Sequence, residues 1–474
     1  MPRVVIGIET SYDGKRDQLY LLEPTSHEGE RTLDINAMLL EAISRIELDI
    51  ENADSANPAH NAQSMEALGK AVYEVLRTHP VIDSEAADHF TIHNPTLSPL
   101  YFFLNTDKAR LLDIPWEAIH APDAGFLAQS RNYAVARAIK LEGYVEPWLF
   151  RPPLRVMAVL GVNTGKQNKT SALGQYKALR EALAHSELAV RLHVLSCEPR
   201  LVARIRRDGR SMPEDQQIEA EFLRSAKTLR KSMETFQPHI LHFFCHGKAD
   251  EQPAIQIATQ LSWTSGIHTE DIMVGAGDIK QFGATDDSLL LVTLACCEGA
   301  SQGSGSTALS MSLAQQLVSV GVPAVVGMRK PILTGLADTF SELFYQELLK
   351  ELTACVASAN GHADGGAEVH LACALHALRR SLFNHGQASP SLQWTMPVLY
   401  TRLAPFRIKV DMGEAQSRAM LAQERALART EHLLKKAPRR MIAPIQRARA
   451  TLDARLKSQQ RGQANGKRNN SRPD

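Results

Sequence analysis

Two cysteines at the end of an apolar run are the residues best suited to nucleophilic chemistry. Residues 288–300 read SLLLVTLACCEGA, a run too short for an ordinary helix that stops at Cys296 and Cys297. Such a run is typical of a strand buried on both faces of a parallel sheet. Ligand sites in open α/β sheets lie at the carboxyl ends of such strands. A thiol placed there, followed by glycines that let a substrate backbone approach, is a candidate nucleophile.

A histidine ends a second apolar run. Residues 238–247 read PHILHFFCHG and finish with His246 and Gly247. If the two predicted strands are parallel neighbours, their carboxyl ends share one edge of the sheet, and His246 would meet the cysteine pair. A thiol needs a base to become a thiolate at neutral pH, and His is the usual one. Because side chains alternate along a strand, Cys296 and Cys297 point to opposite faces, and only one of them can meet His246.

Length and composition indicate an ordinary globular protein. The 474 residues allow two or three domains of ~150 residues, or one large α/β domain with additions. The first residues lack a signal-peptide pattern, and no apolar run approaches the ~18 residues that a membrane span needs. The six cysteines are scattered and include an adjacent pair, which does not resemble a disulfide framework. These features predict a cytoplasmic protein.

The C-terminal segment differs from the rest in charge. Residues 405–474 contain seventeen Lys and Arg against six Asp and Glu, although the whole chain is nearly neutral. We predict a long basic helix over 414–436, interrupted at Pro438 and resumed over 443–457, and then disorder from 459. The charge asymmetry marks this tail as a separate unit and an interaction arm.

The remaining chain alternates between strand-like and helical patterns, which predicts an α/β fold: a mostly parallel sheet with helices on both faces. Residues 249–287 lack this regularity and are predicted to form an insertion or hairpin beside the site. The expected strands are 3–10, 18–22, 99–105, 154–161, 188–195, 239–245, 289–296, 321–328 and 397–401. The expected helices are 36–50, 66–76, 171–185, 212–235, 306–320, 336–354 and 367–382, with loops at 54–64 and 114–126.

Several of these segments resemble the CHAT family, the caspase-like cysteine peptidases of the caspase–separase–gingipain group. LHFFCHG at 241–247 resembles the family's H-x-x-x-H-G segment, and LACCEGA at 294–300 resembles its A-C-E-[ST] segment. The resemblance covers residues 3–403 and is strongest over 114–403. Further matching segments are 69–76, IPWEAIHAPDAGF at 114–126, GVPAVVG at 321–327, FSELFYQEL at 340–348 and WTMPVLY at 394–400.

The resemblance implies a caspase-hemoglobinase-like sheet with an N-terminal α/β extension and the C-terminal basic helix. It divides the chain into an N-terminal region of the module (1–150), a catalytic domain (151–404), the basic helical tail (405–458) and a disordered end (459–474).

The alignment also implies roles for individual residues. It selects Cys297 as the nucleophile, leaves Cys296 in the core, and assigns His246 as the base. The backbone N–H groups of Gly247 and Cys297 would hold the oxyanion. Glu298 is a candidate for substrate contact or for pairing with a basic neighbour, and a solvated loop acid is the alternative. An acid in the substrate pocket would select Arg or Lys; Asp250, Asp286 and Asp287 lie near the right loops, and nothing in the sequence favours one of them over a solvated loop acid.

No cofactor or metal is expected. GVNTGK at 161–166 is one residue short of a phosphate loop, and Gln167 stands where a magnesium-binding Ser or Thr would be. The cysteines lack the C-x₂-C spacing of zinc sites.

The function implied by the resemblance is peptide hydrolysis through a thioester, by an enzyme that a partner or signal activates. Family members act in bacterial antiviral defence or regulated cell death and cut a neighbouring effector, such as a gasdermin-like pore former. The alternative is an inactive caspase-like scaffold that recruits a partner through its basic tail. That tail lacks interleaved aromatic residues, which favours a solvated or partner-binding helix over nucleic-acid binding.

Overall fold

A computed structural model of the chain separates into two compact units. The larger unit contains residues 1–145, 153–352 and 370–406, and the smaller one contains residues 146–152, 353–369 and 407–474. The residues that the structure describes are 3–10, 17–23, 31–33, 37–52, 58–77, 97–105, 109–139, 148–162, 172–210, 216–248, 253–282, 288–296, 306–330, 334–359, 367–385, 392–403 and 406–410.

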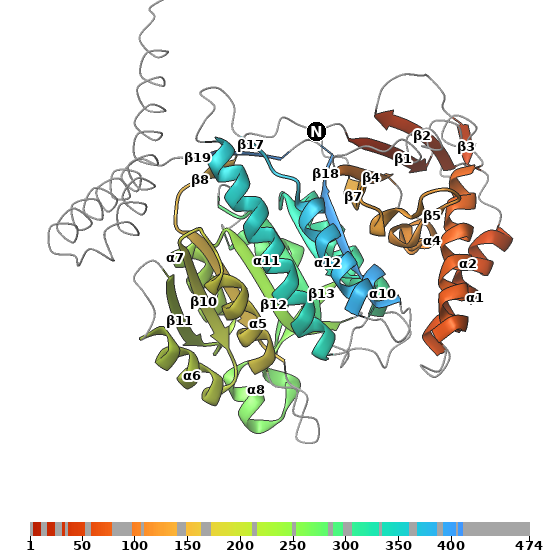
Figure 1. Cartoon of the computed structure of the whole chain (residues 1–474). Coiled ribbons are helices and arrows are strands. Elements are labelled where there is room, and N and C mark those ends of the chain that lie inside the picture. The colour runs from red at the N-terminus through yellow and green to blue at the C-terminus, as the bar shows by residue number, and fades with distance from the viewer. Residues whose placement is uncertain are drawn as a thin grey trace, which may run out of the picture. The chain divides into compact units, whose positions relative to one another are not determined.

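One long sheet organises the larger unit, in the strand order β11-β10-β9-β12-β15-β16-β18-β7-β4-β1-β2-β3 (Figure 1). Its strands are β1 (Val4–Thr10), β2 (Asp17–Glu23), β3 (Arg31–Leu33), β4 (Ser98–Asn105), β7 (Tyr133–Ile139), β9 (Leu154–Leu160), β10 (Val190–Ser196), β11 (Gln216–Phe222), β12 (Ile240–Lys248), β15 (Leu291–Cys296), β16 (Ala324–Met328) and β18 (Pro397–Arg402). Neighbouring strands are parallel except at the β16–β18, β1–β2 and β2–β3 pairs. The expected mostly parallel sheet is confirmed.

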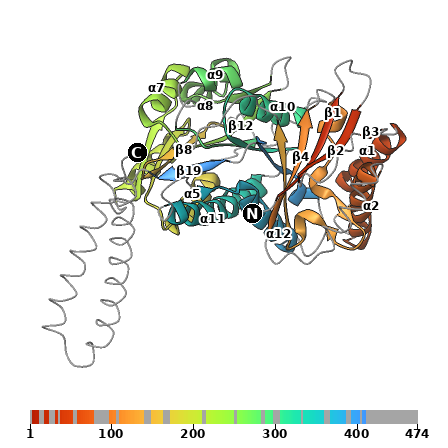
Figure 2. The same cartoon turned by 90° about the horizontal axis from the view of Figure 1, so that it is seen from above.

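Helices cover both faces of this sheet. Figure 2 shows α7, α9 and α10 on one side and α5, α11 and α12 on the other. The helices are α1 (Ala37–Asn52), α2 (Pro58–Arg77), α4 (Ala109–Leu112), α5 (Leu173–Ala184), α6 (Pro199–Gly209), α7 (Ala226–Phe236), α8 (Gln260–Ser265), α9 (Ala276–Gln281), α10 (Ser306–Ser319), α11 (Thr334–Ala359) and α12 (Leu371–His385). Short 3-10 turns lie at Trp116–Ala118, Leu127–Gln129, His268–Glu270 and Leu392–Thr395.

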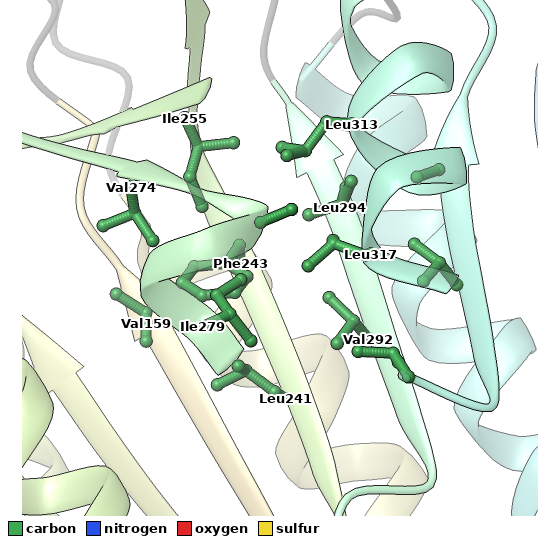
Figure 3. Close-up of a cluster of buried hydrophobic side chains, with 14 of the residues drawn as sticks. Val159, Leu241, Phe243, Ile255, Val274, Ile279, Val292, Leu294, Leu313 and Leu317 are labelled. Carbon is green, nitrogen blue, oxygen red and sulfur yellow. The ribbon is translucent and has the colours of Figure 1, made fainter. Parts of the chain in front are cut away.

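An apolar layer joins the sheet to the first of these helix groups. Leu241 and Phe243 of β12 belong to it, as do Val292 and Leu294 of β15. Figure 3 shows Leu317 of α10 directed at this layer from the helix side. All five side chains are completely buried, and burial of such apolar area contributes ~25 cal/mol per Å² to folding. The centre of the sheet is therefore held firmly where the two apolar runs lie side by side.

A small hairpin widens the sheet beside β12. Strand β13 (Ala254–Ile257) pairs antiparallel with the end of β12 and with β14 (Ile272–Gly275). Ile255 and Val274 direct their side chains into the apolar layer (Figure 3). The prediction of an insertion or hairpin within 249–287 is confirmed.

Strand β7 was not predicted, and its sequence explains why. YAVARAI carries Arg137 in the middle, yet all seven residues are buried. The Arg137 guanidinium donates to both carboxylate oxygens of Glu117, at 2.9 and 2.7 Å. Its Nη1 donates to the carbonyl oxygen of Leu112, and its Nη2, already bonded to Glu117, also donates to the carbonyl oxygen of Ile114. A charge that disfavours a buried strand locally is thus compensated by residues about twenty positions away.

The single helix predicted over 212–235 is wrong. The chain forms β11 at the edge of the sheet and then α7, which begins after Ser225. The Ser225 hydroxyl accepts a hydrogen bond from the Thr228 backbone N–H, as a helix N-cap does. Residues 216–222, QQIEAEF, alternate polar and apolar side chains, which suits an edge strand.

Two further local predictions need correction. Helix α6 (Pro199–Gly209) was not predicted; its Pro occupies the first turn, where a missing N–H costs nothing. The loop expected over 54–64 is also partly wrong, because α2 begins at Pro58 by the same rule.

The smaller unit contains a three-stranded sheet of β17 (Ala367–Glu368), β19 (Arg407–Val410) and β8 (Trp148–Phe150). The rings of Trp148 and Phe150 stack at a centroid distance of 5.5 Å. The predicted basic helix and disordered end lie outside the described residues. Among the helices that are described, none combines the length and apolar character needed to cross a bilayer.

Candidate active site

The predicted base lies near the end of β12, the second apolar run. This strand is sandwiched between β9 and β15 and is buried from Ile240 to His246. His246 is 8% exposed, and Gly247 is half-buried. His246 is the register partner of Gln256 on the hairpin strand β13. The histidine is therefore held in an enclosed position at the carboxyl edge of the sheet.

The predicted nucleophile directly follows β15, the first apolar run. Strand β15 is parallel to β12, and Cys245 is the register partner of Cys296. Strand β15 ends at Cys296, and Cys297 lies outside the described residues, as do Glu298 and Asp250. His246 directly follows Cys245, and Cys297 directly follows Cys296. The predicted base and nucleophile thus come after level positions on two neighbouring parallel strands.

Alternation along β12 and β15 places Cys245 and Thr293 on opposite faces of the sheet. Cys245 belongs to the apolar layer together with Val292 and Leu294. Thr293 instead faces the opposite side, where its hydroxyl lies 3.2 Å from that of Tyr345 on α11. His246 alternates with Cys245 and falls on that same face.

A model of the CHAT domain family matches residues 66–379 of the chain. The chain belongs to the CHAT domain family.

Solved structures show more distant similarity. The Arg-specific cysteine proteinase gingipain R aligns at 8% identity with a TM-score of 0.36, over 85% of this chain and 77% of its own. The separase of the Saccharomyces cerevisiae separase–securin complex aligns at 10% identity with a TM-score of 0.36, over 85% of this chain. The CHAT protein spans 30% of that separase chain. Among curated proteins, none matches this chain.

Positive charges follow the next strand of the CHAT domain sheet. Extending the register of β15 and β16 from Leu294 and Gly327 puts Arg329 level with Cys296. Arg329 and its neighbour Lys330 both form ion pairs with Glu47 of α1. Burial alone would raise the pKa of Glu47, but these two cations outweigh it and lower the pKa. The positive charges of Arg329 and Lys330 are therefore already paired with acidic side chains of α1.

The other described thiols of the CHAT protein lie in unreactive surroundings. Cys197, Cys245 and Cys355 are buried, whereas Cys373 is half-buried. Burial raises the pKa of the Cys197 thiol, with Glu198 adding to the effect. Burial and the nearby Glu351 raise the pKa of Cys373 to about 12. Thiols of this kind stay protonated at neutral pH and react slowly.

His242 is a core histidine whose role the sequence did not reveal. Both ring nitrogens have partners: Nε2 lies 3.2 Å from Gln175 Oε1, and Nδ1 lies 3.2 Å from the Tyr345 hydroxyl. Burial lowers the pKa of His242 to about 3, so the ring is neutral. Its partners come from α5 and α11, far away in the chain, so no local pattern could reveal them.

A buried acid beside the hairpin was also missed. The Asp271 carboxylate, whose side chain is 3% exposed, accepts hydrogen bonds from Gln256 Nε2 at 2.6 Å and from His268 Nδ1 at 2.9 Å. Because Gln256 is the register partner of His246, Asp271 orients the residue opposite the predicted base. Across the described part of the chain, no group of three or more His, Cys, Asp or Glu side chains is arranged to hold a metal ion.

Gly161, from the rejected phosphate loop, serves packing. A Cβ at this position would collide with the Ile257 side chain of β13. Its backbone N–H donates to the Phe244 carbonyl, and its own carbonyl accepts from the Ala258 N–H. This glycine thus lets the end of β9 approach the hairpin.

Proposed function

We propose that this CHAT protein is a cysteine endopeptidase in which Cys297 attacks the scissile carbonyl and His246 acts as general base and acid. The observation that supports this most is the level register of Cys245 and Cys296 on parallel strands. Together with the alternation of side chains, it favours His246 and Cys297 on one face of one edge. Family membership supports the same chemistry, since the residues fall in the segments that resemble the family's catalytic motifs.

The proposed reaction passes through a covalent thioester. His246 removes the Cys297 proton, the thiolate adds to the carbonyl carbon, and the resulting imidazolium protonates the departing amine. Water, with its proton taken by the same imidazole, then hydrolyses the thioester and frees the thiol. Backbone N–H groups of Gly247 and Cys297 would stabilise the oxyanion, and loss of one such donor costs ~10²–10³ in rate.

The biological setting is proposed from the family resemblance alone. We expect a cytoplasmic enzyme that stays inactive until a partner or signal arrives and then cuts a protein effector in antiviral defence or regulated cell death. Glu298 and Asp250 are proposed substrate contacts.

Selective alkylation tests the proposal without a known substrate. Brief treatment with iodoacetamide at neutral pH, followed by mass spectrometry of the peptides, should label Cys297 far faster than Cys197 or Cys373. His246→Ala should remove that selectivity, whereas the matched variant His193→Ala, in β10 of the same sheet, should keep it.

The labelling should be repeated with candidate activators, because an inactive resting form would hide the reactive thiol. Equal labelling of all cysteines under every condition would favour the inactive scaffold and contradict the peptidase.

A further inference from the structure

A buried polar network crosses the face of the sheet on which His246 is expected to act. It joins the two central strands to α5 and α11 through side chains that are completely buried. Its members are Gln175, His242, Thr293, Ser341 and Tyr345. The network reaches solvent through Asp338, which accepts a hydrogen bond from Gln175 Nε2 at 2.7 Å.

The protons of this network can be placed from its partners. Gln175 donates through Nε2 to Asp338, so its Oε1 faces the ring of His242. Because a carbonyl oxygen only accepts, His242 Nε2 carries the ring proton. The neutral ring then leaves Nδ1 as an acceptor 3.2 Å from the Tyr345 hydroxyl, whose single proton is shared between this nitrogen and Thr293 Oγ1. The same hydroxyl is 3.2 Å from Thr293 Oγ1.

Tyr345 therefore straddles two residues that are directly opposite each other. His242 and Thr293 are register partners on β12 and β15. A slip of one strand by one residue would present an apolar neighbour, such as Phe243 or Leu294, to the hydroxyl, because a one-residue shift moves every side chain to the other face. The tyrosine hydroxyl can thus be satisfied by both strands only in the observed register.

His242 and Thr293, the two residues that Tyr345 contacts, lie on the same strand segments as the predicted catalytic pair. His246 lies four residues after His242, and Cys297 lies four residues after Thr293. Residues four apart on a strand share a face and are separated by ~13 Å, at ~3.3 Å per residue. We propose that Tyr345 is a positioning residue whose hydroxyl fixes the register of β12 and β15 and so holds His246 and Cys297 level. The roles of these last two residues rest on the proposed function.

Burial of the network is not explained by stability alone. Polar groups buried without partners cost several kcal/mol, and apolar side chains of similar size would fill the same space at least as well. Uncharged polar groups that are all satisfied instead specify one arrangement. The opposite face of the same strands is entirely apolar at Leu241, Phe243, Val292 and Leu294, so the polar groups concentrate on the catalytic face.

Substitutions that remove single hydroxyl groups test whether Tyr345 fixes the register of β12 and β15. In Tyr345→Phe, we expect the alkylation rate of Cys297 at neutral pH to fall ~10-fold. The pH at which the thiol becomes reactive should rise, because a looser imidazole stabilises the thiolate less. Thr293→Val should behave in the same way, while Thr293→Ser, which keeps the hydroxyl, should behave like the unchanged protein. The double variant should be no slower than the slower single variant, since both remove one unit.

Matched controls separate positioning from general destabilisation. Tyr176→Phe removes another tyrosine hydroxyl, which donates to Asp208 at 2.9 Å on α6, and should leave Cys297 labelling unchanged. In the Tyr345 and Thr293 variants, buried Cys197 should remain protected. If Cys297 labelling is unaffected, or falls only together with loss of Cys197 protection, the positioning role is wrong.

Amide hydrogen exchange tests the positioning role of Tyr345 independently of the peptidase assignment. Tyr345→Phe should speed exchange in β12 and β15 more than in β4 or β7. If His246→Ala shows no effect on Cys297, the proposed function fails, yet the exchange result still decides whether Tyr345 holds the two strands. Unchanged exchange in β12 and β15 would overturn the inference even in an active enzyme.

Discussion

Cys245 and Cys296 are register partners on neighbouring parallel strands, and each directly precedes a residue of the predicted catalytic pair. The Cys245 side chain is completely buried in the apolar layer. Alternation then predicts that the two adjacent thiols point to opposite faces of the sheet. Cys296 would point into the apolar layer, and Cys297 would point to the face of His242 and Thr293.

Paired serine substitutions test this separation. Cys297→Ser should abolish rapid alkylation and any peptidase activity, because serine is a far weaker nucleophile without the thiolate. Cys296→Ser should keep both and lower the free energy of unfolding by ~1–3 kcal/mol, because it places a hydroxyl in apolar surroundings. Peptide mapping and urea denaturation measure the two effects. The opposite pattern, with Cys296 required, would mean that alternation breaks at the end of β15.

The stability of the protein should fall as the pH drops below about 6.5. Burial lowers the pKa of His239 to about 3 and that of His376 to about 4, and the positive charge of nearby arginine adds to the effect at both histidines. Burial alone lowers the pKa of His242 to about 3. Unfolding restores their ordinary pKa of 6.5, so the unfolded state binds protons that the folded state refuses. When the pH is lowered from 7.5 to 5.5, each histidine should therefore decrease the free energy of unfolding by ~1.4 kcal/mol.

His239→Asn isolates one of these contributions. His239 Nδ1 accepts a hydrogen bond from the Arg155 backbone N–H, which an Asn oxygen can replace. The variant should lose ~1.4 kcal/mol less than the unchanged protein over the same pH range. His185→Asn, at the exposed end of α5, is the control. Equal pH dependence in His239→Asn and the unchanged protein would show that His239 titrates alike in both states.

The central strands were predictable because their sequences carry the signal locally. The runs that form β12 and β15 are mostly apolar, interrupted by His242 and Thr293, and stop at a histidine and two cysteines, so their burial and the position of the edge follow from hydrophobicity. The same reasoning fails for β11, whose polar residues resemble a helix and whose strand state depends on pairing with β10.

Long-range pairing explains most of what was missed. Strand β7 pairs in parallel with β4 on one side and with β18, more than 250 residues later, on the other. The partners of His242 come from Gln175 and Tyr345, on separate helices. A sequence pattern reports burial and periodicity but not which distant side chain satisfies a polar group, so the network beneath the site was invisible.

The buried ion cluster at β7 should be a major determinant of stability. Glu117, Arg137 and Arg379 are completely buried, and Arg379 Nη2 lies 4.0 Å from Glu117 Oε1. Burial alone would raise the pKa of Glu117, but the two arginines outweigh it and lower the pKa. Glu117→Gln leaves both cations without a counter-charge and should cost ~3–5 kcal/mol in the free energy of unfolding.

The contrast with an exposed pair tests whether burial is the cause. Glu234→Gln breaks the exposed Arg230–Glu234 pair of α7, spaced i,i+4, and should change the free energy of unfolding by ~0.5 kcal/mol or less. Urea denaturation of both variants at pH 7.5 measures the difference. A loss below ~1 kcal/mol in Glu117→Gln would show that water or rearranged carbonyl groups compensate the arginines.

Helix α2 packs so closely on the ordered loop at 114–126 that a side chain at Gly69 would collide with the loop. A Cβ at Gly69 would lie 2.5 Å from the Ala118 carbonyl oxygen and 2.6 Å from the His120 Cβ. Both atoms are backbone or near-backbone, so the helix would have to move away. We expect Gly69→Ala to lower the free energy of unfolding by ~1–3 kcal/mol, although alanine is the better helix former by ~1 kcal/mol.

Gly277→Ala provides the matched comparison. Gly277 lies in α9, and a Cβ there would meet nothing within 4 Å. Only helix propensity should then operate, so this variant should be more stable by up to ~1 kcal/mol. Thermal and urea unfolding of the two variants should therefore shift in opposite directions. A stabilising effect at Gly69 would mean that the α2 contact with the loop is looser than these distances require, because the added methyl group has room.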